Sequence, residues 1–379
     1  MVSPRSLAPI LAPLLSILAA ACSSGGSGPA PEPTPKVDPS TFGVSDVGPF
    51  TCGHRVLETT YAQPAGQPMR TIPVHVWYPS TSTDGEHARY KGIFVDTVAW
   101  EDGALAPSAF AGGYPVLLHS HGYQGFAGNS ARLMCHFASH GWLAVAPEHV
   151  GNTLIDTPDP LPLAMYYQRP LDMRAALDFI DHLPEGDALA GKADLAQIGV
   201  SGHSFGTYTA WAEGGAAFDL PTFEAKCDAG DLAACDAAGL AVFETDLSEK
   251  RAKAIMPLAG GPSAYFGKSG YDAVKVPVLL MSGTLDKVKA EEIFDGVKGV
   301  DLSWVEVEGG CHQLYGLGNT FKGADECTVL PDEEGFGIVN PILLAFARYH
   351  VLGERGDEVT GLALGTKGLS PKAHFQHTK

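Results

Sequence analysis

The sequence predicts an α/β protein with a mainly parallel central sheet, helices on both faces, and one inserted segment at residues 216–251. Apolar runs typical of strands alternate with segments whose apolar residues recur at helical spacing. Several of the strand runs are apolar without interruption, which indicates strands buried on both faces. The chain has 379 residues, 45% of them hydrophobic, so it can build one large domain.

The expected elements follow one another in a regular order. Strands are predicted within residues 72–79, 113–123, 142–149, 196–206, 254–260, 276–286 and 302–310. Helices are predicted at residues 129–141, 169–183, 289–297 and 337–351, and another begins at 207. Pro170 is expected in the first turn of its helix. Apolar and polar residues alternate in the strand at 302–310, as in a partly exposed strand. The helix at 337–351 is expected to close the chain. The acidic, Ala-rich insertion breaks this order, and the sequence leaves open whether it is a lid or a surface decoration.

The first 22 residues are predicted to be an export signal. Arg5 precedes an apolar stretch that is too short for a membrane span and ends in small residues before Cys22. The ending LAAAC resembles a bacterial lipoprotein signal, which implies a lipid on Cys22; an ordinary secretory signal is the alternative. Residues 23–45 are rich in Ser, Gly and Pro and predict a flexible linker, with the folded domain at 46–379. We therefore expect an exported protein, either lipid-anchored to a bacterial membrane, the outer one by preference, or secreted.

Charge and cysteine content narrow the class further. The formal net charge of −18 argues against nucleic-acid binding and against electrostatic attraction to anionic lipid. Six cysteines follow Cys22, and an even number in an exported chain predicts disulfides. The pairs closest in sequence are Cys227 with Cys235 and Cys311 with Cys327, and both are expected to be bonded. No zinc-type spacing is present, so neither a metal nor another cofactor is expected.

The stretch GHSFG at residues 202–206 carries the strongest chemical signal. It ends an apolar run and precedes a helix, which is the strand–turn–helix context of Gly-x-Ser-x-Gly. Small residues on either side let the chain turn sharply and leave the hydroxyl of Ser204 exposed. The alternative is a tight turn that merely favours Gly and Ser. The context favours Ser204 as a nucleophile.

A serine hydroxyl needs a base, and the base is expected later in the chain, after an acid. Asp286 ends the run VLLMSGTLD, and His312 follows the next strand in VEVEGGCHQLY. Asp286 would orient the imidazole of His312, which would act as general base and then as general acid. The alternatives are a helix N-cap for Asp286 and an ordinary loop histidine for His312.

Two backbone N–H groups are expected to bind the oxyanion. One belongs to Phe205, directly after the nucleophile, and the other to Tyr123 in the loop HSHGYQG. The side chains of Tyr123 and Phe205 would also line the substrate pocket. His119 and His121 of the same loop are interpreted as structural rather than catalytic.

These four motifs, HSHGYQG, GHSFG, VLLMSGTLD and GGCHQLY, resemble the α/β-hydrolases in order and spacing. The similarity is greatest to the branch of dienelactone hydrolase-like, platelet-activating-factor acetylhydrolase-like and cutinase-like bacterial polyester hydrolases, and it covers residues 71–353. The resemblance implies a metal-free serine hydrolase of carboxylic esters with Ser204, Asp286 and His312 as its triad. Dienelactone hydrolases have cysteine as the nucleophile, and polyester hydrolases usually have Met after the serine, where this chain has Phe205.

Three functions remain in view at this stage. The first is an exported esterase or lipase, with lipids, small esters or polyesters as substrates. The second is an amidase or peptidase on the same fold. The third is a non-catalytic surface-binding lipoprotein, because the scaffold does not dictate activity.

Overall fold

The computed structural model describes residues 38–318 and 330–378. The predicted signal, Cys22 and most of the predicted linker lie outside the described residues. The packed chain begins a few residues before the predicted boundary at 46, because Val44 is fully buried and its carbonyl lies 3.0 Å from Nε2 of His136. No helix in these described ranges is long and apolar enough to cross a membrane.

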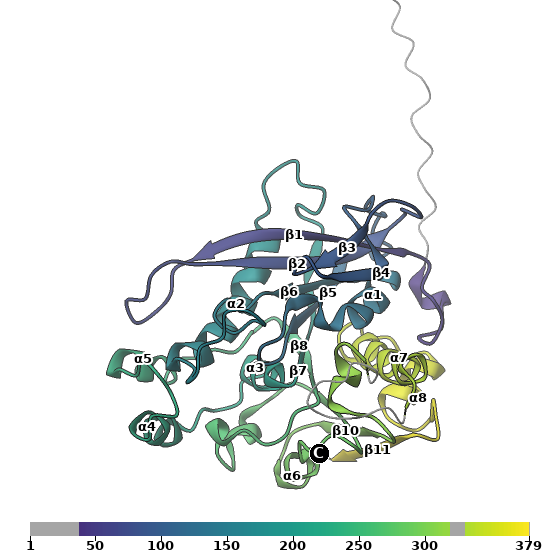
Figure 1. Ribbon diagram of the computed structural model, residues 1–379. Coiled ribbons are helices and arrows are strands. Elements are labelled where there is room, and N and C mark those ends of the chain that lie inside the picture. The colour runs from purple at the N-terminus through teal and green to yellow at the C-terminus, as the bar shows by residue number, and fades with distance from the viewer. Residues whose placement is uncertain (1–37, 319–329, 379) are drawn as a thin grey trace, which may run out of the picture. The chain divides into compact units, whose positions relative to one another are not determined.

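The described residues form one eleven-stranded sheet with helices on both faces (Figure 1). The strands are β1 (Thr51–Tyr61), β2 (Arg70–Ser80), β3 (His87–Tyr90), β4 (Phe94–Glu101), β5 (Tyr114–Ser120), β6 (Leu143–Pro147), β7 (Ala193–His203), β8 (Ala252–Leu258), β9 (Val278–Gly283), β10 (Leu302–Val307) and β11 (Ala373–Thr378). The helices are α1 (Ala131–Ser139), α2 (Leu163–Asp181), α3 (Phe205–Glu213), α4 (Leu220–Asp228), α5 (Ala237–Val242), α6 (Ala290–Gly296), α7 (Asp332–His350) and α8 (Asp357–Ala363). Short 3-10 turns are η1 (Pro39–Thr41), η2 (Ala127–Ser130), η3 (Ala264–Phe266), η4 (Gly270–Ala273) and η5 (His312–Tyr315).

The strand order is β11-β10-β9-β8-β7-β5-β6-β2-β1-β4-β3. The middle of the sheet, from β6 to β10, is parallel, whereas β2 and β11 join its two sides antiparallel. The parallel strands point their carboxyl ends to the same edge. Loops that follow β5, β7, β9 and β10 therefore meet at that edge, which is where ligands bind in such sheets.

Two cores lie on opposite faces of this sheet. Along β5, Val116 and Leu118 face the core built with α2 and α3, whereas Leu117 faces the core built with α1 and α7. All three side chains are fully buried, which explains why this strand reads as an uninterrupted apolar run. The predicted mainly parallel sheet with helices on both faces is confirmed.

Helix α2 begins six residues earlier than the sequence predicted, so Pro170 lies inside it rather than in its first turn. A proline has no N–H, so the carbonyl of Tyr166, four residues earlier, cannot receive its usual helical hydrogen bond. The hydroxyl of Tyr208 donates to this carbonyl at 3.1 Å. This bond from α3 satisfies the carbonyl and lets the helix continue through Pro170.

The carboxyl-terminal end also differs from the prediction. The helix expected to close the chain, α7, is followed by α8 and by β11. Strand β11 pairs antiparallel with β10, so β10 is not the partly exposed edge that its alternation indicated. All its residues except Glu306 are buried.

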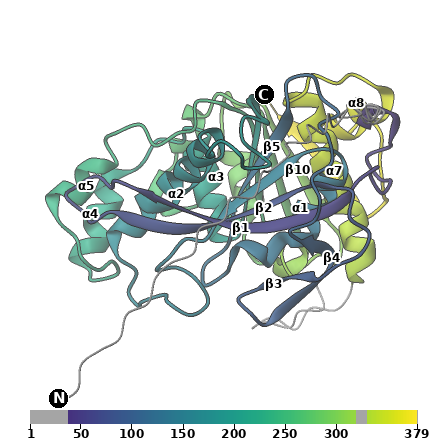
Figure 2. The same ribbon diagram turned by 90° about the horizontal axis from the view of Figure 1, so that it is seen from above.

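The insertion at residues 216–251 carries α4 and α5 at the opposite end of the domain from α7 and α8 (Figures 1 and 2). The predicted bond between Cys227 and Cys235 is present. Phe223 is fully buried and stacks on Phe243 with ring centroids 3.9 Å apart. The aromatic side chains of the insertion thus belong to the core that is built with α2 and α3.

A second disulfide, between Cys52 and Cys135, ties β1 to α1 across 83 residues of sequence. It was not predicted, because sequence proximity selects short loops and this pair is joined only by the fold. Cys327 lies outside the described residues, so its bond to Cys311 stays a prediction.

Candidate active site

Ser204 sits on a strained turn between β7 and α3. Its backbone has φ +57° and ψ −117°, a region that non-glycine residues rarely adopt. A Cβ on Gly202 would lie 2.0 Å from the carbonyl oxygen of Gly206, and a Cβ on Gly206 would lie 2.0 Å from that of Ser120. The two glycines are therefore required by space, and they allow the tight strand-to-helix turn that the motif indicates.

The structure brings Ser204, His312 and Asp286 together from three separate loops. Nε2 of His312 lies 2.8 Å from Oγ of Ser204, and its Nδ1 lies 3.2 and 3.1 Å from the two carboxylate oxygens of Asp286. A carboxylate only accepts hydrogen bonds, so Nδ1 carries the proton and Nε2 is free to accept from the serine hydroxyl. This is the geometry of a base directed at a nucleophile.

The loops after β9 and β10 brace each other to hold the acid and the base. The N–H of Leu285 donates to the carbonyl of Gly310 at 3.0 Å. A Cβ on Gly283 would lie 2.1 Å from that same oxygen, so the two backbones are in close contact here. The side chain of Asp286 is only 4% exposed, and this shelters its contact with His312 from water.

His203 is a positioning group that the sequence reading missed. Its Nε2 donates to the backbone carbonyl of His312 at 2.9 Å, and its ring lies 5.0 Å from that of His312. Burial, and then the neighbouring His312, lower the pKa of His203 to about 3, so the ring is neutral at physiological pH. The sequence feature that could have revealed His203 is its place directly before the nucleophile in GHSFG. That place is the variable position of Gly-x-Ser-x-Gly, so the sequence alone does not show whether its residue has a function.

The two residues predicted to supply oxyanion donors flank Ser204. Phe205 is the first residue of α3, where N–H groups have no partner within the helix. The loop after β5 comes close on the other side, because a Cβ on Gly122 would lie 3.0 Å from Cβ of Ser204. The rings of Tyr123 and Phe205 are 6.4 Å apart, and Tyr123 is 44% exposed.

An aromatic wall continues from Phe205 toward the insertion. The ring of Tyr166 lies 5.3 Å from Phe205 and 4.4 Å from Tyr265. Phe223 of the insertion packs 4.5 Å from Tyr265. The insertion thus supports one wall of the site from behind.

Apolar side chains are exposed on loops beside the triad. Leu285 directly precedes Asp286 and is 44% exposed. Leu154 and Ile155 lie in the loop after β6, which is tied to the loop after β5 by the N–H of Leu154 donating to the carbonyl of Gly125. We refer to the exposed apolar residues of these loops, Tyr123, Leu154, Ile155 and Leu285, as the apolar rim.

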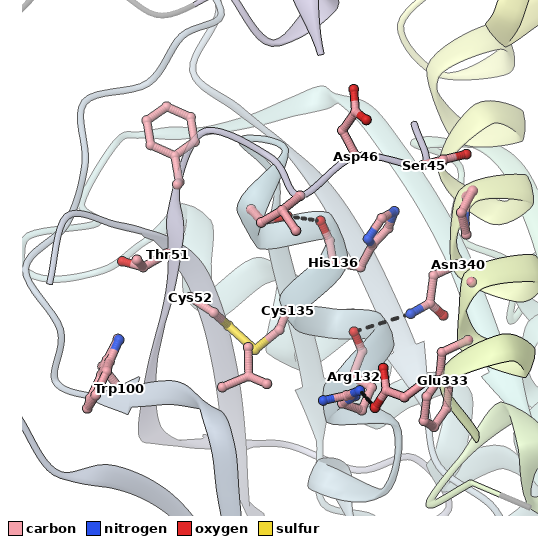
Figure 3. Close-up of a pocket in the computed structure, with 17 residues that line it drawn as sticks. Ser45, Asp46, Thr51, Cys52, Trp100, Arg132, Cys135, His136, Glu333 and Asn340 are labelled. Atoms are coloured by element: carbon pink, nitrogen blue, oxygen red, sulfur yellow. Dashed lines mark hydrogen bonds and ion pairs between the residues drawn. A yellow bond between two sulfur atoms is a disulfide. The ribbon is translucent and has the colours of Figure 1, made fainter. Parts of the chain in front are cut away.

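A separate cavity of about 410 Å³ lies between the start of the folded chain, α1 and α7 (Figure 3). The disulfide of Cys52 and Cys135 lines it, together with Trp100 and the ion pair of Arg132 with Glu333. None of the triad residues lines this cavity. Its histidine, His136, faces the carbonyl of Val44, and burial lowers the pKa of this ring to about 3. The cavity therefore holds no base aimed at a nucleophile.

Within residues 38–318 and 330–378, no group of three or more His, Cys, Asp or Glu residues is arranged to hold a metal ion.

The comparisons with known proteins concern the fold and one part of the chain. The family model described as chlorophyllase matches residues 104–225, which include Ser204 but neither Asp286 nor His312. The crystal structure of a ferulic acid esterase from Streptomyces cinnamoneus superposes with a TM-score of 0.59 at 17% identity, over 87% of this chain and 97% of that one. None of the curated proteins matches the sequence. The structural similarity shows that the chain has the α/β-hydrolase fold that the sequence motifs indicated.

Proposed function

We propose that the protein is an exported serine hydrolase of carboxylic esters. The observation that carries the proposal is the hydrogen-bonded series from Ser204 through His312 to Asp286, with the serine on a strained turn. The structural neighbour is described as an esterase, which favours esters over amides.

The geometry suits a two-step acyl transfer. Oγ of Ser204 attacks the ester carbonyl while Nε2 of His312 takes the hydroxyl proton, and Asp286 stabilises the resulting imidazolium. The N–H groups of Phe205 and Tyr123 bind the oxygen that becomes negative. The imidazolium then protonates the leaving alcohol, which departs and leaves an acyl-enzyme. Water, deprotonated by His312, releases the acid and restores Ser204.

The apolar rim favours esters with an apolar acyl or alcohol part. Ile155 is 81% exposed. A substrate that covered this side chain would bind more tightly, because removing apolar surface from water lowers the free energy of the complex. Lipids, small aromatic esters and polyesters all satisfy this requirement. Chain-length preference separates an open cleft from one built for long acyl chains.

The test is a series of p-nitrophenyl esters from acetate to palmitate, with wild type beside Ser204→Ala. We expect turnover by the wild type and a loss of at least about 10⁴-fold in kcat in the variant. The variant should keep its fold, because alanine can make every core contact that Ser204 makes. Equal activity in both proteins would mean another nucleophile. A matched p-nitroanilide series tests amide cleavage, and a folded wild type that hydrolyses neither series and resists a fluorophosphonate would be a binding protein.

Export and lipid anchoring form a separate part of the proposal. Two disulfides between described cysteines suit an oxidising compartment. We expect Cys22→Ser to move the protein from the membrane fraction to the soluble fraction, because lipidation needs that thiol. Cys227→Ser is the matched control, since it also removes a cysteine but lies in the folded domain. A Cys22→Ser protein that stays in the membrane fraction would rule out this anchor.

A further inference from the structure

The peptide between Gly122 and Tyr123 is held from its carbonyl side. The oxygen of Gly122 accepts a hydrogen bond from Nδ1 of His121 at 2.8 Å and another from the N–H of Gly125 at 3.1 Å. A Cβ on Gly125 would lie 3.2 Å from Nδ1 of His121, so this packing leaves little room for movement.

In a trans peptide, the N–H points opposite to the carbonyl of the same unit. The carbonyl of Gly122 and the N–H of Tyr123 belong to one peptide unit, so fixing the carbonyl also fixes the direction of the N–H. That peptide lies beside the nucleophile, as the 3.0 Å approach of a Gly122 Cβ to Ser204 shows. Whatever holds the carbonyl therefore aims the proposed oxyanion donor.

His121 can do this in only one protonation state. A carbonyl accepts only, so Nδ1 of His121 must carry a proton. Nε2 accepts from the backbone N–H of His149 at 3.0 Å and must therefore be unprotonated. The two bonds together select the neutral Nδ1–H tautomer, and burial, followed by the charges of His149 and Arg169, lowers the pKa of this ring well below its usual value.

Arg169 supports the same loop from beneath. Its guanidinium is fully buried and donates to the carbonyl of His121, to Oγ of Ser120 at 2.9 Å, to Oδ1 of Asn152 at 2.7 Å and to Oγ1 of Thr209 at 3.0 Å. It also lies 4.5 Å from the ring centroid of Phe205. One side chain thus contacts both segments that carry the proposed oxyanion donors.

We propose that His121, backed by Arg169, is a positioning residue of the active site, whose Nδ1–H clamps the Gly122–Tyr123 peptide and directs the Tyr123 N–H at the oxyanion. The inference rests on the proposed ester hydrolysis. A purely structural role for His121 is the competing explanation, since either hydrogen bond would stabilise the loop.

Two conservative variants separate the two bonds of His121. In His121→Asn the amide nitrogen takes the place of Nδ1 and keeps the donor to Gly122. In His121→Gln the longer side chain keeps an acceptor near the N–H of His149 and loses that donor. We expect Asn to retain kcat within about threefold and Gln to lower it about 10- to 100-fold with KM within about threefold, because only the oxyanion contact is displaced.

A trifluoromethyl ketone, which forms a tetrahedral adduct with the serine, measures the same donor without turnover. Its affinity should fall in His121→Gln by the same factor as kcat/KM and should stay near wild type in His121→Asn. The reverse ranking, or equal losses in both variants at matched unfolding temperatures, overturns the inference. A folded wild type without Ser204-dependent ester turnover overturns the proposed function and this inference with it.

The wild-type protein offers a test that does not depend on variants that fold. Nitrogen NMR of ¹⁵N-histidine-labelled protein distinguishes protonated from unprotonated ring nitrogens. We expect the resonances of His121, assigned with His121→Asn, to show a proton on Nδ1 and none on Nε2 at neutral pH. If that variant does not fold, assignment by through-bond correlation to the His121 backbone replaces it. The opposite tautomer in the active enzyme overturns the inference alone.

Discussion

Asp286 faces His312 with both carboxylate oxygens at nearly equal distance, 3.1 and 3.2 Å from Nδ1. The carboxylate fixes the tautomer that leaves Nε2 free for Ser204. We predict that Asp286→Asn lowers kcat on a short ester about 10³- to 10⁴-fold with little change in KM, because an amide can donate to Nδ1 and move the proton to Nε2. Steady-state kinetics at pH 7 check this.

The control for Asp286→Asn is its thermal unfolding, which should match the wild type since the amide has the same shape. A decrease in kcat of less than tenfold would show that the carboxylate charge is not needed at His312. Comparison with Ser204→Ala at the same enzyme concentration sets the background rate.

At the scale of single residues, the sequence singled out those that stand in a recognisable catalytic motif. Ser204 stands in Gly-x-Ser-x-Gly, and Asp286 and His312 stand at the ends of apolar runs, so their positions could be expected from order alone. His121 and His203 could not be ranked in the same way. Each ring bonds a particular backbone carbonyl, and which carbonyl it reaches depends on how separate loops meet in three dimensions.

The turn from β7 to α3 depends on backbone contact with β5. Any side chain on Gly206 would meet the carbonyl of Ser120, a backbone atom that cannot rotate away. We predict that Gly206→Ala removes ester hydrolysis and lowers the free energy of unfolding by at least about 3 kcal/mol. Urea unfolding and initial rates measure the two effects.

Gly337 in α7 is the matched control for Gly206. It is exposed, and a Cβ there would have nothing within 4 Å. Gly337→Ala should stabilise the protein by about 0.5 to 1 kcal/mol, because alanine loses less backbone entropy in a helix. Equal effects of the two substitutions would contradict the steric explanation for the turn.

Helices and strands with a regular spacing of apolar residues could be predicted from the sequence. Features that depend on contacts with other helices or strands could not. Helix α2 was expected to start at residue 169 with Pro170 in its first turn, where a proline is tolerated. It starts at Leu163 instead, and Tyr208 of another helix supplies the missing hydrogen bond. Strand β10 alternates like an edge strand, yet β11 covers it. The strands β1, β3 and β4 were not recognised, because their exposed residues give no continuous apolar run.

Across the whole molecule, the parallel middle of the sheet places the site at the edge where its strands end. The flanking elements pack against the faces of the sheet. The disulfide of Cys52 and Cys135 joins an outer strand to α1, and α7 and α8 cover the same face. The domain core buries histidines, and protonating a buried histidine lowers the stability of the folded state. Their pKa shifts therefore connect the packing of the whole domain to its stability in acid.

His119, fully buried on β5, gives the clearest case. Burial, and then the charge of Arg169, lower its pKa to about 3, below the value of about 6.5 expected when the chain unfolds. Between these two values the unfolded chain binds more protons, so this group's stabilising contribution is complete above pH 6.5 and is lost as pH falls toward 3. Its share between pH 7 and pH 5 is about 1 to 2 kcal/mol.

Other buried titratable groups change the free energy of unfolding in either direction as the pH falls. The prediction is therefore stated as a difference between wild type and a variant. His203 follows the same sign as His119, whereas burial raises the pKa of Glu213 and Asp172, which lose stabilisation as pH rises. We predict that the change in unfolding free energy between pH 7 and pH 5 is about 1 to 2 kcal/mol smaller in His119→Asn than in wild type. Asparagine keeps a polar group near Oγ of Ser201, which the ring contacts at 2.8 Å, but cannot titrate. Urea unfolding at the two pH values measures the difference, and identical pH dependence in both proteins would show that His119 is protonated equally in the folded and unfolded states.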